Sequence, residues 1–235
     1  MNATNSLLLG ALVALGLAAA GYFIGNGFVE ARALERSVEV KGLAEREVPA
    51  DTAIWPLTFV VAGNELDTLL EQVEDQGGQV RAFLKLRGFE DQEISMSAPS
   101  ITDRLAQSYG EPDVRFRYTV SQTITVYTAK IQTVRDAGRE LLSLGKAGIV
   151  FNQENYELRT QYLFNGLNDL KPAMIEEATR NAREVAEKFA ADSSSRLGKI
   201  RAARQGQFSI SDRDSNNPHI KNVRVVSTVE YYLVD

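Results

Sequence analysis

The side chains that most often carry catalysis are nearly absent from this sequence. It contains one histidine, His219, and no cysteine. A serine or cysteine nucleophile needs an imidazole to accept its proton, and zinc sites use clustered cysteine and histidine ligands. His219 stands alone in the polar segment SNNPHIKN, which predicts a surface loop residue and not a catalytic base. We therefore predict no catalytic residue, no cofactor and no metal site.

Acidic and hydroxyl side chains offer weaker alternatives. Asp212 and Asp214 lie in the oxygen-rich segment SDRDSNN, where carboxylates could hold a hard cation. The segment lacks the glycine and the distal glutamate of a calcium loop, so a solvated turn is favoured. The serines at 193–195 predict the end of a helix and not a nucleophile. With 31 acidic residues in the chain, a carboxylate-based hydrolase stays open as an alternative.

The N-terminal segment is set apart by its charge. Residues 1–29 contain no charged side chain, and all 26 basic and 31 acidic residues follow them. The apolar run within residues 6–28 has the length of a membrane-spanning helix, which needs about 20 residues. We predict a transmembrane anchor or signal-like segment at 1–29 and a linker at 30–36. No basic residue precedes the apolar run, which favours an uncleaved anchor over a signal peptide.

The charges beyond the anchor bear on orientation and partners. Arg32, Arg36, Lys41 and Arg46 follow the apolar run. By the positive-inside rule they place the large domain in the cytoplasm, although long domains can be translocated regardless of charge. The net charge is −5, and basic residues are interspersed with acidic ones. This pattern predicts no nucleic-acid partner.

Hydrophobic periodicity predicts the elements that follow the anchor. Strands are expected at 37–48, 52–61, 94–104, 115–127, 149–162, 199–210 and 223–234, and helices at 64–88, 130–144 and 172–197. Strand pairs with polar faces and helices between them predict an α+β fold. We expect mixed, largely antiparallel sheets with three main helices, preceded by one N-terminal transmembrane helix.

Particular residues refine this expectation. Asn64 is predicted to cap the first helix, and Pro56 predicts an edge or a bulge in the second strand. The single tryptophan, Trp55, predicts packing in a core or an interface. Alanines recur every fourth residue in the last helix, which lets it lie close to a sheet. They occupy positions 178, 182, 186 and 190.

Two stretches of sequence resemble a known family. Residues 38–53 read VEVKGLAEREVPADTA, which resembles the opening signature of the SIMPL-domain family: V-x-G, a small residue, then a P-D-x-A-like turn. Here Ala50 intervenes between Pro49 and Asp51. The alanine-rich helix followed by LGKI at 197–200 resembles a second family feature. The segments WPL at 55–57 and KPAM at 171–174 resemble its membrane-anchored bacterial branch. The resemblance covers about residues 37–235, a SIMPL-like α+β domain.

The resemblance implies a location and a role. It implies an exported bacterial envelope protein, held in the inner membrane by one span, with its domain in the periplasm, against the charge count. It implies no established enzymatic activity, whereas some members are associated with envelope stress and with higher-order oligomers. We expect the membrane, further copies of the chain and an envelope protein as partners. Self-assembly or partner binding is the expected function, and a carboxylate-based hydrolase or a small-ligand-binding periplasmic domain is the alternative.

Overall fold

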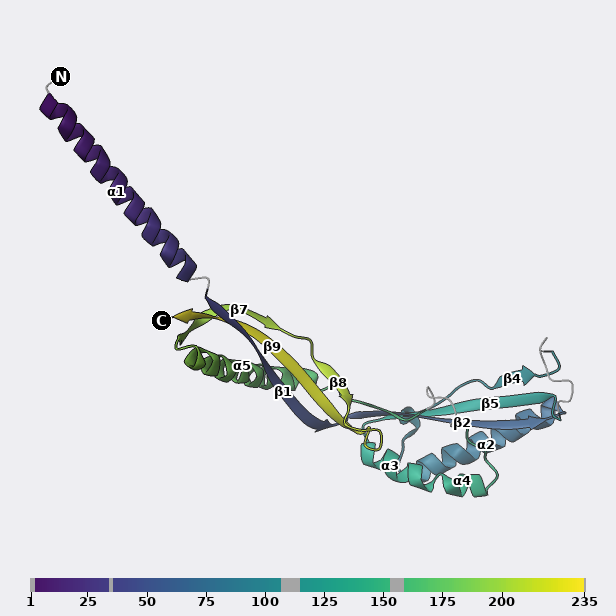
Figure 1. The fold of residues 1–235 in the computed structure, drawn as a ribbon. Helices are drawn as coiled ribbons and strands as arrows, with labels where there is room; N and C mark the ends of the chain where they lie inside the picture. Colours follow the sequence, from purple (N-terminus) through teal and green to yellow (C-terminus); the bar gives the residue numbers. More distant parts are fainter. Residues whose placement is uncertain (1–2, 34–35, 107–114, 153–158, 235) are drawn as a thin grey trace. The chain divides into compact units, whose positions relative to one another are not determined.

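The computed structural model describes residues 3–33, 36–106, 115–152 and 159–234, apart from the side chains of residues 3–9, 11 and 29–33. The helices are α1 (Ala3–Ala33), α2 (Leu66–Leu86), α3 (Ile131–Glu140), α4 (Leu142–Lys146) and α5 (Leu167–Asp192), with a 3-10 turn, η1 (Asp91–Glu93). The strands are β1 (Ser37–Pro49), β2 (Thr52–Gly63), β3 (Ile94–Met96), β4 (Ser100–Asp103), β5 (Tyr118–Thr128), β6 (Gln161–Leu163), β7 (Arg196–Gln205), β8 (Ser209–Asp212) and β9 (Ile220–Val234) (Figure 1). The predicted α+β class is confirmed.

The chain divides into two compact units. The first unit comprises residues 1–46, 170–209 and 223–235, and the second comprises residues 47–169 and 210–222. The predicted boundaries at residues 29 and 36 stay predictions.

The N-terminal segment forms one continuous helix, α1. Within the part of the chain that the structure describes, no helix combines the length and the apolarity needed to cross a membrane. The membrane span expected at residues 1–29 therefore stays a prediction.

The first unit packs α5 on a sheet. The sheet has the order β1-β9-β7, with β8 also pairing β9, and β7 runs antiparallel to β9. The four predicted alanines of α5 are each at most 2% exposed. Two of them, Ala182 and Ala186, belong to a core that also contains Val40, Val229 and Tyr231. The predicted alanine ridge is confirmed, and its small side chains let the backbone of α5 lie close to the strands.

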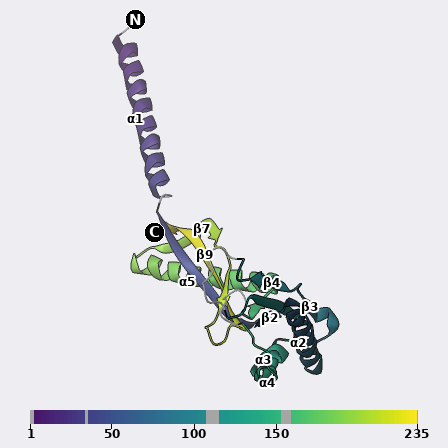
Figure 2. The ribbon, with the colours of Figure 1, turned by 90° about the vertical axis from the view of Figure 1, so that its right-hand side faces the viewer.

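The second unit packs three helices on a sheet. The sheet has the order β3-β5-β2-β6, with β4 also pairing β5. β2 and β5 are antiparallel, from Ala53 opposite Thr128 to Gly63 opposite Tyr118. In both views α2, α3 and α4 lie on the same side of this sheet (Figure 1 and Figure 2). The largest fully buried side chains of this core are Phe59, Val73, Val80, Leu84, Val120, Ile124, Val126, Val134 and Ile149.

Two helix boundaries differ from the prediction. The last helix was expected at 172–197, but α5 begins five residues before Pro172 and ends at Asp192. Ser194 has a φ of 55°, so the chain turns there and β7 begins at Arg196, which places Gly198 in a strand. The first helix is not capped by Asn64. Its N-cap is Glu65, which makes no side-chain cap, and the Asn64 Oδ1 accepts the backbone N–H of Arg117 instead.

The predicted helix at 130–144 is interrupted. It forms α3 and α4, which are separated at Leu141. Leu142 is 71% exposed, whereas Leu144 is 7% exposed. The break shifts the helical register, so Leu144 turns inward.

Three predicted strands are also divided. The segment 199–210 spans the end of β7 and the start of β8. The segment 94–104 forms β3 and β4, which both pair with β5. In the segment 149–162, Phe151 forms an isolated bridge with Phe59, and β6 begins at Gln161. Residues 153–158 of this predicted strand lie outside the described residues.

Candidate ligand-binding site

One edge of β2 has no strand partner among the described residues over a short stretch. On this edge β6 pairs only with Thr52–Ile54, and the next contact is the bridge between Phe59 and Phe151. Pro56 lies between these two pairings. A proline has no N–H to offer a neighbouring strand. On its other side Pro56 is in register with Thr125 of β5, and residues 153–158 lie outside the described residues, so the predicted edge or bulge at Pro56 stays a prediction.

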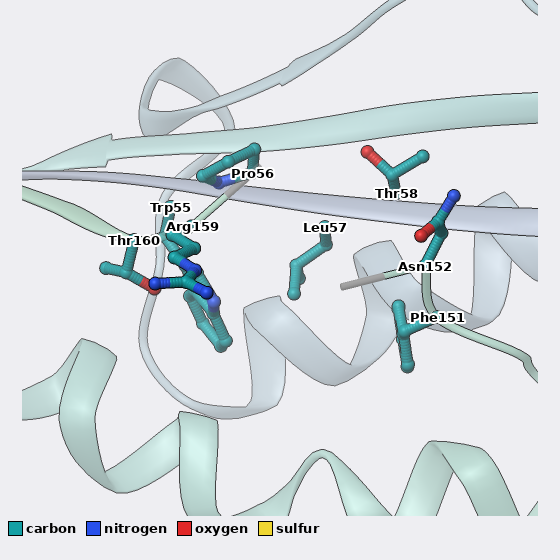
Figure 3. A pocket seen from close by; sticks show the side chains of 8 residues that line it. All are labelled: Trp55, Pro56, Leu57, Thr58, Phe151, Asn152, Arg159 and Thr160. Carbon is teal, nitrogen blue, oxygen red and sulfur yellow. The ribbon is translucent and has the colours of Figure 1, made fainter. Parts of the chain in front are cut away.

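A hollow of about 360 Å³ adjoins this stretch of β2. Figure 3 shows the side chains of Trp55 and Leu57 on one side of β2 and those of Pro56 and Thr58 on the other. The remaining lining residues are Phe151, Asn152, Arg159 and Thr160. We call this the first hollow.

A second hollow of about 490 Å³ shares Trp55 and Thr160 with the first. It is bounded by β6, by α3 and by the turn between β8 and β9. Its other lining residues are Val134, Arg135, Gly138, Arg139, Tyr162, Ser215, Asn216, Pro218 and His219. Among the described residues that line the two hollows there is no Asp or Glu. Together we call them the Trp55 hollows.

The side chain of Trp55 lines both of the Trp55 hollows. It is 4% exposed, and its ring lies 6.2 Å from that of Phe89 at an angle of 56°. The predicted core packing of the single tryptophan is confirmed. Its position also makes it a built-in reporter of anything that occupies the Trp55 hollows.

The turn that carries His219 is fastened at two places. The N–H of Ala50 donates a hydrogen bond of 2.8 Å to the carbonyl oxygen of His219. The Oδ1 of Asp214 accepts the backbone N–H groups of Asn216 and Asn217, each at 2.9 Å. These bonds hold the turn against the start of β2, so the wall of the second hollow is fixed by local geometry.

The two aspartates of this segment are already engaged by cations. Asp214 forms an ion pair with Arg213 at 2.9 Å, and this partner is the main reason that the pKa of Asp214 lies below its usual range. Asp212 pairs with Lys221, whose side chain is 9% exposed. Within the described residues, no three His, Asp or Glu side chains are grouped as metal ligands. The favoured prediction of a turn is confirmed for this segment.

His219 and Tyr162 face each other across the second hollow. Their ring centroids lie 6.1 Å apart in an edge-to-face arrangement. Burial is the main cause that lowers the pKa of His219 below 6.5, and the positive charges of Arg135 and Arg213 lower it further. Burial also raises the pKa of Tyr162 above 10.0. At neutral pH the imidazole is therefore uncharged, and the phenol keeps its proton.

The second hollow gathers donors that have no acceptor. Arg135 donates one hydrogen bond of 2.9 Å, from Nη1 to the side chain of Gln132. In the described part of the chain, its other N–H groups, the Tyr162 hydroxyl and the His219 ring have no hydrogen-bond partner. Arg139 lies one turn along the same helix and pairs with Asp136 at 3.1 Å. This arrangement can hold an anionic group, and its described lining residues include no carboxylate.

The sequence prediction missed these residues. Arg135 and Arg139 are four positions apart and share a face of the predicted helix, which is the only local signal. Nothing in the sequence connects them with His219, more than 75 residues away in the chain. Among residues singled out from the sequence, Trp55, Pro56 and His219 line the Trp55 hollows.

Comparison with known families identifies the domain. A family described as SIMPL, a protein of unknown function (DUF541), matches residues 38–229. The chain belongs to the SIMPL family. No curated protein matches the chain.

The residues of the SIMPL opening signature have structural roles in this chain. Gly42 lies against α5, where a Cβ would stand 1.8 Å from the carbonyl oxygen of Ala178. The carboxylate of Asp51 accepts the backbone N–H groups of Asn165 at 2.6 Å and Gly166 at 3.1 Å. Ala50, which departs from the signature, supplies the N–H that holds the His219 turn. The SIMPL signature thus fixes the scaffold in each unit and does not line the Trp55 hollows.

Proposed function

We propose that this SIMPL protein is a membrane-anchored envelope protein that acts by binding, and that the Trp55 hollows hold an anionic ligand. The observation that carries the proposal is the convergence of Arg135, Tyr162 and His219 on a hollow whose described lining contains no carboxylate. These donors are not among the buried atoms that lack a partner, so they are open to solvent in the hollow and a ligand can reach them. A carboxylate, sulfate or phosphate group would supply the acceptor that they lack.

The composition of the lining favours binding over hydrolysis. A carboxylate-based hydrolase needs two acidic groups beside its substrate. The Trp55 hollows are lined instead by arginine, aromatic and amide side chains in the described part of the chain. The small-ligand-binding domain is therefore the alternative that the geometry supports best.

The proposed location rests on the N-terminal segment. No charged residue occurs in residues 1–29, and the described apolar side chains of α1 are exposed, from 55% at Val13 to 74% at Phe23. A lipid environment would cover them. We place α1 in the inner membrane as a single span, with the SIMPL domain in the periplasm and a role in envelope stress tolerance.

Trp55 provides the test. Its emission, as the only tryptophan, would be followed in the full chain in detergent while sulfate, acetate or the neutral probe glycerol is added. We expect sulfate and acetate to change the emission and glycerol to leave it unchanged. Replacing Arg135→Gln should weaken sulfate binding at least about tenfold, because a hydrogen bond to a charged group contributes about 1.5–3 kcal/mol.

A matched variant controls for general charge effects. Arg81→Gln removes an exposed arginine of α2 that pairs with Asp91, and it should leave sulfate binding unchanged. The proposal is wrong if no anion alters the Trp55 emission at tens of millimolar. It is equally wrong if Arg81→Gln weakens binding as much as Arg135→Gln.

Self-assembly is the second candidate, and β7 favours it. β7 is an edge strand of the first unit, and eight of its ten residues are exposed. An exposed strand edge can pair with another chain. The absolute mass of the full chain, measured by light scattering with the detergent contribution subtracted, tests this candidate. A discrete oligomer would support it, and a monomer at all concentrations would remove it.

A further inference from the structure

A third hollow, of about 600 Å³, lies in the first unit between α5 and β7. Arg180 and Arg183 reach it from α5, Lys199 and Ile200 from β7, and Tyr231 from β9. Ile200 is 51% exposed. The hollow therefore combines three cationic side chains with an apolar surface that is open to solvent.

The cationic and hydroxyl groups that line this hollow have few ion-pair or hydrogen-bond partners in the described part of the chain. Arg183 forms an ion pair with Glu187 at 3.0 Å. Among the described residues, neither Arg180 nor Lys199 has a carboxylate within ion-pair distance. Tyr231 is only 4% exposed, and its hydroxyl has no hydrogen-bond partner in the described part of the chain. The Tyr231 hydroxyl is not among the buried atoms that lack a partner, so it is accessible from the hollow. Together with two unmatched cations it can bind a ligand with a negatively charged oxygen group.

The hollow lies at the end of the unit where α1 is attached. Arg36 follows the last residue of α1 by three positions, and its carbonyl oxygen accepts the N–H of Leu233 at 2.9 Å. Leu233 is two residues from Tyr231, which lies opposite Ile200. A chain advances at most about 3.3–3.6 Å per residue, so the hollow is within about 30 Å of the end of α1.

We infer that this hollow binds the headgroup of an anionic phospholipid of the bilayer that holds α1. The inference rests on the anchoring proposed above. The phosphate would lie between Arg180 and Lys199 with the Tyr231 hydroxyl as a donor, and Ile200 would contact the glycerol and the upper acyl chain. Basic side chains near an anionic membrane surface bind such headgroups through charge, and the apolar surface gives a lipid an advantage over free phosphate.

Lipid binding to the full chain in detergent tests the inference. Native mass spectrometry would compare phosphatidylglycerol with phosphatidylcholine. We expect phosphatidylglycerol to bind more tightly, and the double variant Arg180→Gln with Lys199→Gln to weaken its binding about 25-fold, since each basic residue near an anionic surface contributes about fivefold. The control double variant is Arg201→Gln with Arg204→Gln, which removes the same total charge from positions of β7 outside the hollow. This control variant should bind phosphatidylglycerol as tightly as the unchanged protein.

The remaining outcomes distinguish a failure of the lipid-binding inference from a failure of the proposed membrane anchor. Flotation of the full chain with phosphatidylcholine vesicles tests the anchor alone. If the chain does not float, both the anchor and the inference are wrong. If it floats but binds the two lipids equally, or if the control variant loses as much binding, only the inference is wrong. Complete competition by inorganic phosphate would also overturn it, because the site would then take free phosphate.

Discussion

Gly42 of β1 and Ala178 of α5 are in direct backbone contact. A Cβ on Gly42 would stand 1.8 Å from the Ala178 carbonyl oxygen and 2.4 Å from the Ala182 nitrogen. Both clashing atoms belong to the helix backbone, so a side-chain rotation cannot relieve them. The glycine of the V-x-G signature is therefore a packing requirement, and it is matched by the alanines that let α5 approach.

Replacing Gly42→Ala should destabilise the first unit by at least about 3 kcal/mol, because an overpacked site must displace backbone. Thermal unfolding of the full chain, followed by circular dichroism, should show a melting temperature lower by roughly 6 °C or more. The neighbouring Leu43→Ala is the control. Leu43 is 38% exposed, so this change should cost far less. Equal losses for the two variants would contradict the close contact.

Asp51→Asn should destabilise the second unit at neutral pH by about 1–3 kcal/mol. Burial acts to raise the pKa of Asp51, but hydrogen bonds from Asn165, Thr52 and Gly166 together hold it below 3.8. A carboxylate whose folded pKa is lowered stabilises the fold above its unfolded pKa, and this contribution is lost as the pH falls through the folded pKa. The free energies of unfolding of the two proteins, measured in urea through the Trp55 emission, should therefore differ at pH 7 and become equal well below pH 3.8. If this difference in the free energy of unfolding did not change with pH, the stabilising role of the Asp51 carboxylate would be disproved.

Two adjacent glycines in the middle of α2 should respond differently to alanine. Gly78 is exposed with open space around its Cα, and alanine there should stabilise the helix by about 1 kcal/mol. A Cβ on Gly77 would stand 3.2 Å from Gln122 Oε1 and 3.5 Å from the Met96 methyl group. Gly77→Ala should therefore give a smaller gain or a loss. If both substitutions raised the urea midpoint equally, the close packing of α2 on the sheet would be refuted.

His219 should make stability depend on pH between 7 and 5. Burial and nearby arginines lower its folded pKa below 6.5. The unfolded state then binds the proton more readily, so stability is present above pH 6.5 and declines as the pH falls. His219→Gln should reduce this decline. Because His219 is the only imidazole, its NMR signal gives the pKa directly, and sulfate in the Trp55 hollows should raise it. A folded pKa at or above 6.5 without ligand would contradict the prediction.

Local patterns in the sequence predicted much of the fold. The alternation in β5 and the four-residue spacing of alanines in α5 are set by strand and helix geometry, so they can be seen without the tertiary structure. Composition alone argues against catalytic and zinc sites that are built from cysteine and clustered histidine. The charge-free residues 1–29 likewise predict an anchor from composition and length.

Boundaries and sites depended on contacts that no local pattern contains. The start of α5 follows a turn held by Asp51, which lies more than 110 residues earlier. Asn64 has the chemistry of a helix cap, yet its oxygen is used by the backbone of Arg117. In each case a partner distant in sequence competes with the local preference.

The sequence by itself determined the fold class, the family and the scarcity of catalytic side chains, because these follow from composition, periodicity and short motifs. The tertiary structure alone decided where unmatched donors gather. Arg135, Tyr162 and His219 come from a helix, a short edge strand and a turn. Only the pairing of β6 with β2 and the bond from Ala50 to His219 bring them to one hollow, since long-range strand pairing and turn closure are properties of the whole chain.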